Sequence, residues 1–441
     1  ASPNTPVYVL FLYSQGFLNR AAVAALGITP QTPAAPGTRY EFTADGGAIL
    51  HAEPNPDLLY ATIGALPPMS RQQQALSTRH YYRELNRFGL TSVIDAGGGG
   101  HHFPEDYRGS ELLALSGELP VRISKYLFPQ DKGGELEEFR RWTCAWHAGL
   151  NRGAGAMNSW VVRGGGEFLA WAAGDYENFL ADQPDITTRP GWDRQLLAVT
   201  RHLLAKRWPL RIHATYDESV NHIIDVFEQA HAHEVTEGRL GFAGIRWVLD
   251  HGETLQPPTL ARVRALGGGM AMQARMAYAG EYFLERYGEE ATRNVPPMGD
   301  VIAAGVPLGL GSDGTRVASY NPWVTLYWAT TGRSVGGTEL HAERHRLSRE
   351  RALYHHTVGS AWVSQEEVLK GRLKPGQFAD FAVLSAPYLK VDDEALRDIE
   401  AELTVMNGKA VYGAGDFSNE VEALPSIVPP WSPVAHYGGY Q

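Results

Sequence analysis

Cysteine is almost absent from this chain, and its scarcity excludes two kinds of site. Among 441 residues, only Cys144 carries a thiol. A single thiol cannot form an internal disulfide, and it also rules out a zinc site built from cysteines. The count does not decide the redox compartment, because disulfide-free secreted proteins are common.

Long apolar runs and an excess of positive charge are also lacking. No apolar run reaches the ~18 residues that a membrane helix needs, and no signal-peptide pattern opens the sequence. The formal net charge is −10, which is not the electrostatic footprint of a nucleic-acid-binding protein. We therefore expect a soluble protein without nucleic acid or membrane as partners, which leaves a small molecule among the possible substrates. Cytoplasm, periplasm and secretion all stay open.

The composition that is present is typical of a globular protein that is rich in histidine. Hydrophobic residues make up 44% and charged residues 20% of the chain, with 16 histidines and 11 tryptophans. The first two values are ordinary for a folded domain, and the length allows one large α/β barrel. The histidine count raises the question of whether some of them bind a metal.

Short apolar runs alternate with helical patterns through most of the chain. Seven runs end in polar or glycine residues, at 91–97, 121–127, 167–172, 210–213, 246–251, 269–273 and 307–313. Helical patterns occupy 72–88, 136–150, 192–206, 219–231, 257–266 and 298–304. This alternation predicts an α/β fold with a parallel sheet. A closed (β/α)₈ TIM barrel needs eight strands, and the rival doubly wound sheet lacks its glycine-rich fingerprint.

The pattern changes near the C-terminal end, where antiparallel elements are predicted. A helix is expected over 348–363 with Ser348 as its N-cap, a strand near 378–384, and a hairpin over 403–412 with an Asn-Gly turn. We divide the chain into a lead-in segment or insertion (1–65), a barrel (66–346), the last barrel helix with a partial β-sandwich (347–424) and a tail (425–441).

Polar residues follow four of the predicted strands. Asp95, His213, His251 and Asp313 each end an apolar run, and barrel enzymes place their chemistry at the carboxyl ends of strands. Burying an aspartate or a histidine is costly unless it is paired or bound to a metal. Any one of them could be an ordinary loop or cap residue, but four at the same end of the sheet favour a site.

Three of these residues suit metal-assisted hydrolysis. His213 and His251 lie on neighbouring strands, so their imidazoles could bind one metal together. Strand alternation places Asp250 on the opposite face from His251, where we expect it to pack against helices. Asp313 follows the last predicted strand. Its carboxylate could bind metal, accept a proton from water and return it to a leaving group.

Five motifs in this order resemble the amidohydrolase superfamily, and in particular the branch called amidohydrolase family 3, which includes N-substituted formamide deformylase-like enzymes. They are His213-Ala-Thr-Tyr-Asp217, Asp250-His251-Gly-Glu, Gly311-Ser-Asp313, Gly371-Arg-Leu-Lys-Pro-Gly-Gln-Phe-Ala-Asp380 and Leu403-Thr-Val-Met-Asn-Gly-Lys-Ala-Val-Tyr412. The resemblance implies a barrel with a β-sandwich, one or two divalent metal ions, most plausibly zinc, and hydrolysis of a non-peptide amide or related C–N bond.

The sequence departs from this family at the first barrel strand, which in relatives carries the metal-binding motif His-x-His. His231-Ala-His233 has that spacing but lies at a helix end, and His101-His102 follows a glycine-rich turn. The resemblance therefore implies that the first strand and half of the β-sandwich are missing from this chain. We expect them on a second polypeptide or a missing N-terminal segment that carries His-x-His.

A second departure concerns the bridging ligand. Many relatives place a carboxylated lysine on the fourth strand, whereas Glu167 stands near that position here, and its carboxylate could bridge two cations without modification. It could also be an ordinary surface residue. Lys125 is a lesser candidate for the bridging role.

Five further residues are weak candidates for substrate binding, because they follow strand ends: His101, His102, Tyr216, Arg275 and Arg316. The alternatives to an amidohydrolase are a lyase, isomerase or esterase on the same metal site, or a degenerate barrel that serves as a non-catalytic subunit. We also expect a homo-oligomer.

Overall fold

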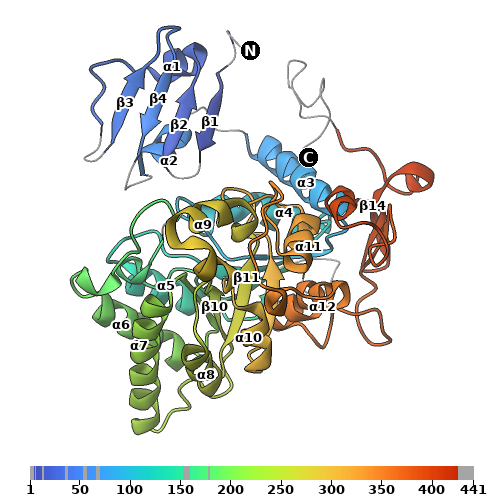
Figure 1. Cartoon of the computed structure of the whole chain (residues 1–441). Coiled ribbons are helices and arrows are strands. Elements are labelled where there is room, and N and C mark those ends of the chain that lie inside the picture. The colour runs from blue at the N-terminus through green and yellow to red at the C-terminus, as the bar shows by residue number, and fades with distance from the viewer. Residues whose placement is uncertain are drawn as a thin grey trace. The chain divides into compact units, whose positions relative to one another are not determined.

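The protein forms two compact units, residues Ala1–Gln74 and Ala75–Gln441, which are shown in Figure 1. This computed structural model describes residues 4, 6–11, 14–34, 38–52, 57–65, 70–151, 159–176 and 179–425. The division lies in the first turn of helix α3 (Arg71–Arg87), whereas the sequence placed a boundary at residue 65. Residues 426–441 of the predicted tail lie outside the described part.

The first unit is a small antiparallel sheet with two helices. Its strand order is β1-β2-β4-β3, and α1 (Arg20–Leu26) and α2 (Asp57–Gly64) complete it. The strands are β1 (Tyr8–Phe11), β2 (Gln15–Leu18), β3 (Arg39–Phe42) and β4 (Ala48–His51). Helix α1 begins at Arg20, because the Asn19 side chain accepts a hydrogen bond from the Ala22 amide and caps the helix.

The second unit is built on a curled sheet of seven parallel strands, the number that the sequence predicted. Their order is β12-β11-β10-β9-β8-β6-β5, and the short β7 (Leu150–Asn151) pairs antiparallel with β8. The strands are β5 (Ser92–Asp95), β6 (Arg122–Leu127), β8 (Trp160–Gly165), β9 (Leu210–Ala214), β10 (Trp247–His251), β11 (Gly269–Gln273) and β12 (Leu308–Gly311). Within the described residues, β5 and β12 are the two edges of this sheet.

One predicted strand was wrong. The third strand of the sheet is Trp160–Gly165, not residues 167–172, which form a loop with a 3₁₀ turn at Trp171–Ala173. Glycine allows the true strand to approach its neighbour, since a Cβ on Gly164 would lie 2.0 Å from the Pro209 carbonyl oxygen. The apolar residues that suggested a strand instead pack their rings together, with Phe168 and Trp171 centroids 5.2 Å apart.

Helices follow the strands of the second unit. They are α3 (Arg71–Arg87), α4 (Arg108–Ser116), α5 (Glu135–Ala145), α6 (Trp192–Ala205), α7 (Asp217–Thr236), α8 (Pro257–Ala265), α9 (Arg275–Arg293), α10 (Met298–Ala303), α11 (Pro322–Thr331), α12 (Arg349–Tyr354) and α13 (Ser360–Val363). A π-helical turn, His355–Gly359, joins the last two. Ser348 caps α12 as predicted, because its hydroxyl accepts from the Arg351 amide. The sequence did not suggest α4, α9 or α11.

The two faces of the parallel sheet have different covers. Helices pack on the outer face, where the Phe227 ring of α7 lies 5.2 Å from that of Trp247. The segment after α12 covers the inner face: Val363 packs against Val248 and Ala271, and the Tyr126 hydroxyl donates to the Val363 carbonyl. This segment therefore covers the inner face of the sheet below the carboxyl ends of the strands.

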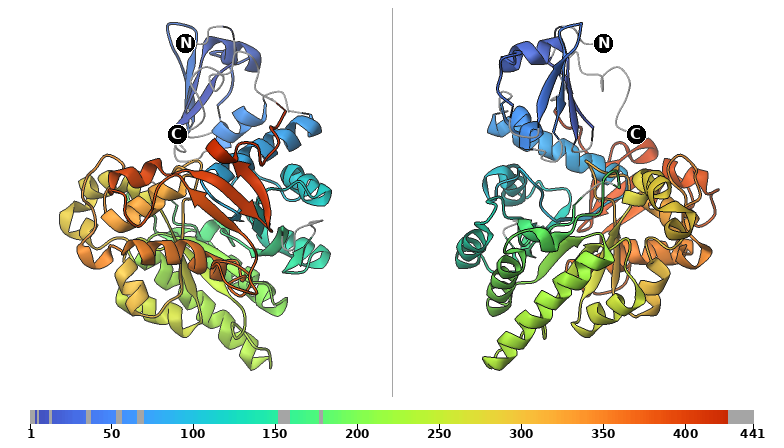
Figure 2. Two further views of the ribbon diagram at one scale, coloured as in Figure 1. Left: turned by 90° about the vertical axis from the view of Figure 1, so that its right-hand side faces the viewer. Right: turned by 60° about the vertical axis from the view of Figure 1, so that its left-hand side comes forward.

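A separate antiparallel sheet follows, as the sequence predicted. It consists of β13 (Phe381–Leu384), β14 (Ala401–Met406) and β15 (Lys409–Gly413), coloured red in Figure 2. Asn407 and Gly408 have positive φ angles of 53° and 74°, which is the conformation that an Asn-Gly hairpin turn requires. No helix in the described part of the chain is long and apolar enough to cross a membrane.

Candidate metal centre

Three side chains converge beside the carboxyl ends of neighbouring strands. Glu167 follows β8, His213 lies near the end of β9, and His251 ends β10. One ligand atom from each lies within 4.8 Å of the others, the one such group of three among the described residues. Glu167 Oε1 is 3.8 Å from His213 Nδ1, and Glu167 Oε2 is 3.4 Å from His251 Nε2. The Glu167 carboxylate thus lies between the two imidazoles.

The backbone holds Glu167 at this point. Its amide donates to the Ala96 carbonyl, and its own carbonyl accepts from the His213 amide, both with short distances of 2.8 and 2.9 Å. The preceding Gly166 has a φ of 126°, and a Cβ there would lie 2.3 Å from the Arg211 carbonyl oxygen. The glycine run before Glu167 is therefore needed to bring this carboxylate close to β9.

Two residues of the predicted site have left-handed backbone conformations. The φ angle is 75° at His251 and 58° at Asp313. Such conformations are uncommon for residues other than glycine, cost of order 1–3 kcal/mol and cluster at functional sites. At His251 this conformation replaces the strand geometry that would otherwise make successive side chains alternate.

Buried carboxylates raise the proton affinity of both histidines. Burial opposes the charge on His213, but Asp175 and Glu167 outweigh it and raise its pKa to about 10. Burial and the charge of His213 oppose protonation of His251, yet Glu167 and Glu253 raise its pKa above the usual value. Burial also works against the Glu167 charge, but the two histidines hold the pKa of this carboxyl well below its usual range. The same carboxylates that favour a proton on these histidines also favour a bound cation at this centre.

Asp313 lies two residues beyond β12 and does not join this group of three ligand atoms. Its side chain reaches solvent, but the surrounding protein removes part of its hydration and raises its pKa to about 6. The charge of His251 acts against that shift, and the charge of Glu167 adds to it. The charges of the centre therefore influence the pKa of Asp313, and the resulting pKa suits proton exchange near neutrality.

The donor set fits a divalent cation. Nδ1 of His213 and Nδ1 of His251 are buried and have no hydrogen-bond partner among the described residues. Buried polar atoms without partners are rare in native structures, and one explanation is an ion. Two imidazoles and one carboxylate are typical zinc ligands.

A second carboxylate, Asp175, was missed by the sequence analysis. It is fully buried, and its Oδ1 lies 3.4 Å from His213 Nε2. Asp175 stands in the loop after Trp171–Ala173, between Gly174 and Tyr176. No strand end or motif spacing marks that position, so the sequence carried no signal for it.

Two of the weak candidates for substrate binding, Tyr216 and Arg275, are buried and contact other side chains. The Tyr216 hydroxyl is 3.4 Å from that of Tyr287. Arg275 Nε lies 3.3 Å from Glu253 Oε1, and its guanidinium carbon lies 4.1 Å from the Phe179 ring centre. Arg275 also lowers the pKa of Asp313, so it belongs to the same region of the strand ends.

The other candidates for substrate binding, His101, His102 and Arg316, follow strands β5 and β12 in the chain. His101 and His102 lie in the turn after β5, where burial and the charge of Arg316 lower the pKa of His101. Asp95, which ends β5, accepts a hydrogen bond from the Gly97 amide and serves as a turn cap. None of these side chains joins the group of three ligand atoms.

Lys125 lies away from the centre. Its Nζ lies 3.4 Å from the ring centre of Trp160, whose indole donates to Ser110 of α4 on the outer face of the sheet. Burial lowers the pKa of Lys125 well below its usual value. Lys125 therefore does not join Glu167, His213 and His251. Asp250, which the strand alternation assigned to the helix-covered face, pairs instead with Arg211 on the inner face.

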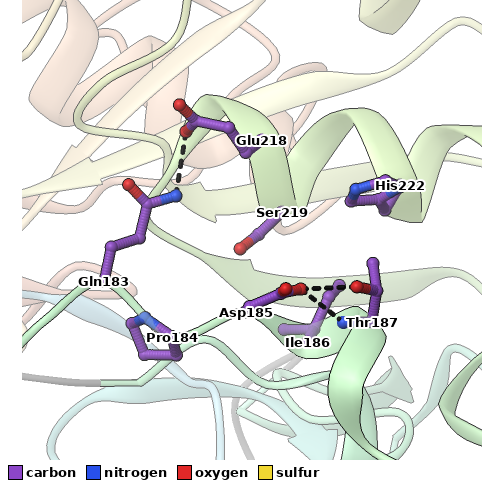
Figure 3. A pocket seen from close by; sticks show the side chains of 8 residues that line it. All are labelled: Gln183, Pro184, Asp185, Ile186, Thr187, Glu218, Ser219 and His222. Carbon is purple, nitrogen blue, oxygen red and sulfur yellow. Dashed lines mark hydrogen bonds between the residues drawn. The ribbon is translucent and has the colours of Figure 1, made fainter.

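A separate cavity lies at the start of α7 (Figure 3). It is lined by Gln183, Pro184, Asp185, Ile186, Thr187, Glu218, Ser219 and His222. Its carboxylates have partners, because Asp185 accepts from the Thr187 amide and hydroxyl and Glu218 accepts from the Gln183 amide group. None of its lining residues belongs to the three converging ligands.

Comparison with known proteins agrees with this geometry. The amidohydrolase family matches residues 1–412. The chain belongs to the amidohydrolase family. Bacillus subtilis YtcJ, whose name describes it as an amidohydrolase, is 23% identical over 417 residues that cover 90% of this chain and 72% of YtcJ. The Arabidopsis thaliana protein LONG AFTER FAR-RED 3 is 23% identical, over 83% of this chain and 63% of its own length.

Solved structures of other hydrolases share the fold. A metal-dependent hydrolase from Pyrococcus horikoshii has a TM-score of 0.62 at 20% identity, covering 88% of this chain and 73% of that one. A variant of atrazine chlorohydrolase TrzN from Arthrobacter aurescens, in complex with zinc and atraton, has a TM-score of 0.54 at 15% identity, with 84% and 77% covered. At these identities the likeness concerns the fold.

Proposed function

We propose that this chain is a metal-dependent hydrolase that cleaves a non-peptide amide or related C–N bond. The observation that carries the proposal is the convergence of Glu167, His213 and His251 at the carboxyl ends of the parallel strands, where barrel enzymes have their active sites. Nitrogen and oxygen donors of this kind favour zinc. The zinc complex of the structurally similar TrzN supports that choice.

Each residue of the centre has a role in this proposal. His213 and His251 would hold a cation, and Glu167 would bridge two cations if a second ion is present. A bound divalent cation supplies Lewis acidity, which polarises a carbonyl group and makes water acidic near neutral pH. Asp313 takes the proton of the attacking water and delivers it to the leaving nitrogen. Arg275, Tyr216, His101, His102 and Arg316 remain candidates for substrate binding.

The edges of the parallel sheet favour one further component. Among the described residues, β5 and β12 each pair with another strand on one side only, whereas a closed (β/α)₈ barrel has eight strands and no edge. On the free side of β12, His355 Nδ1 lies 3.0 Å from the Leu308 carbonyl oxygen, and the Ser360 hydroxyl donates to the Leu310 carbonyl. We propose that a strand with the His-x-His motif, from a second polypeptide or an additional N-terminal segment, pairs between β5 and β12. It would bring two more imidazoles to the centre.

Metal binding is the first test. Equilibrium dialysis against Zn²⁺, followed by elemental analysis, should find bound metal in the wild type and little in His213→Ala or His251→Ala. His233→Ala is the matched control, because this histidine is exposed near the end of α7. Equal metal content in all four proteins would contradict the site, and absence of metal from the wild type would favour a degenerate barrel.

The bond type and the assembly need two further measurements. Zinc-loaded protein should hydrolyse N-substituted amides faster than the matching esters, and the opposite preference would favour an esterase. Native mass spectrometry should find the 48.4 kDa chain with a companion polypeptide, and it would also test the predicted homo-oligomer. An active 48.4 kDa species with no companion would contradict the proposed strand.

A further inference from the structure

The Asp175 carboxylate is fixed by the backbone that follows His213. The Thr215 amide donates to both of its oxygens, at 3.0 Å to Oδ1 and 2.8 Å to Oδ2, and the Tyr216 amide donates to Oδ2 at 2.9 Å. Asp175 has no exposed surface. These bonds leave Oδ1 directed at His213 Nε2, 3.4 Å away.

This contact decides which nitrogen of His213 is available as a ligand. A neutral imidazole has one protonated nitrogen and one lone pair, and its hydrogen-bond partner selects between them. A carboxylate can only accept, so Asp175 favours the proton on Nε2. The lone pair is then on Nδ1, which faces Glu167 and the centre at 3.8 Å.

Aromatic packing keeps the ring in that orientation. Phe168 stacks on the His213 ring with centroids 5.1 Å apart and an interplanar angle of 30°. Tyr176, the neighbour of Asp175 in the chain, lies 5.9 Å from the same ring.

We propose that Asp175 is a positioning residue for the metal centre. It holds His213 with Nε2 protonated and presents Nδ1 to the cation, while acting only through this histidine. The proposal rests on the metal-dependent function proposed above. Carboxylates in this arrangement typically change metal affinity by about 10–100-fold when they are replaced.

Asp175→Asn tests the role without changing the shape of the side chain. The backbone amides of Thr215 and Tyr216 require an acceptor, so the asparagine oxygen should stay with them. Its NH₂ group then faces His213 Nε2, which must become the acceptor, and the proton moves to the nitrogen that should bind the metal. We expect Zn²⁺ affinity, measured by competition with a chromophoric chelator, to fall by about 10–100-fold.

Asp380→Asn is the matched control. Asp380 is also a buried aspartate that accepts a backbone hydrogen bond, from Asn407 at 2.7 Å, but it pairs with Arg122 away from the centre. It should lose stability in urea unfolding and keep the wild-type Zn²⁺ affinity. If both variants lose affinity equally, or neither does, the positioning role is wrong.

A measurement on the wild type covers the case in which Asp175→Asn does not fold. In zinc-loaded protein with ¹⁵N-labelled histidine, the His213 signals should show a protonated Nε2 and a metal-bound Nδ1. His213→Gln identifies those signals. Metal on Nε2 would overturn the positioning role alone, whereas a wild type that binds no zinc would overturn both this inference and the proposed function.

Discussion

Two buried polar clusters on the same face of the parallel sheet are built in opposite ways. The metal centre consists of Glu167, His213 and His251, and the Glu167 oxygens lie 3.8 Å from His213 Nδ1 and 3.4 Å from His251 Nε2. The ion-pair cluster below it consists of Arg122, Arg163, Arg211, Asp250, Glu366, Lys370 and Asp380. There every charge has an opposite charge within contact distance.

The difference is sharpest along β9. Arg211 and His213 are two residues apart, so their side chains share a face of the sheet. Arg211 Nε donates to Asp250 Oδ2 at 2.8 Å, whereas His213 Nδ1 lies 3.8 Å from Glu167 Oε1. Matched charges of the first kind hold the structure together, and the looser geometry of the second leaves space for an ion between the groups.

The largest expected effect comes from a substitution at the candidate site that leaves the ion-pair cluster intact. Asp313→Asn removes the proton acceptor while keeping the size of the side chain. Losing a general base costs about 10²–10⁴ in rate, so kcat for amide hydrolysis should fall by that factor while urea unfolding stays unchanged. Near-normal turnover in this variant would show that another group transfers the proton.

Glu366→Gln should lower the stability of the protein and leave the metal centre intact. Arg163 lies 2.7 Å and Lys370 2.6 Å from the Glu366 carboxylate, and removing its charge leaves two buried cations unmatched. Breaking a buried pair costs about 3–5 kcal/mol, which urea unfolding would measure, while Zn²⁺ affinity should be retained. Glu367→Gln is the control, because its pair with Arg246 is partly exposed and should be worth at most about 1 kcal/mol.

Glu167→Gln tests the residue that lies between the two imidazoles. If its carboxylate bridges two cations, the variant should bind about one ion fewer per chain than the wild type, because a neutral amide is a poor bridge. Glu137→Gln, a change at an exposed site on α5, should leave the metal content as it is. Equal stoichiometry in both variants would remove Glu167 from the ligand set.

The smallest effect comes from a buried histidine outside both clusters. Burial lowers the pKa of His341 to about 3, below the ordinary value of about 6.5 in the unfolded chain. The unfolded state therefore binds the proton first as the pH falls, and stability present above pH 6.5 is lost below it. Between pH 7 and 5 we expect a loss of about 2 kcal/mol that His341→Gln removes. A parallel pH dependence in wild type and variant would exclude His341 as its source.

The sequence by itself determined most of the periodic elements. Alternating apolar runs and helical patterns were enough to place six of the seven parallel strands, since the period of a pattern follows from local geometry. The Ser348 cap and the Asn-Gly turn at 407–408 were predictable for the same reason, because each depends on a few neighbouring residues. His213 and His251 were predictable because they end apolar runs.

Only the tertiary structure decided the contacts between segments that are distant in the chain. The strand before Glu167 was misplaced, because Phe168 and Trp171 look like strand residues until their packing partners are known. Asp250 was assigned to the wrong face, because its pairing with Arg211 depends on the neighbouring strand. Asp175 has no sequence signal at all: its role arises from a loop that returns to the backbone of Thr215 and Tyr216, and loop paths are set by the packed fold.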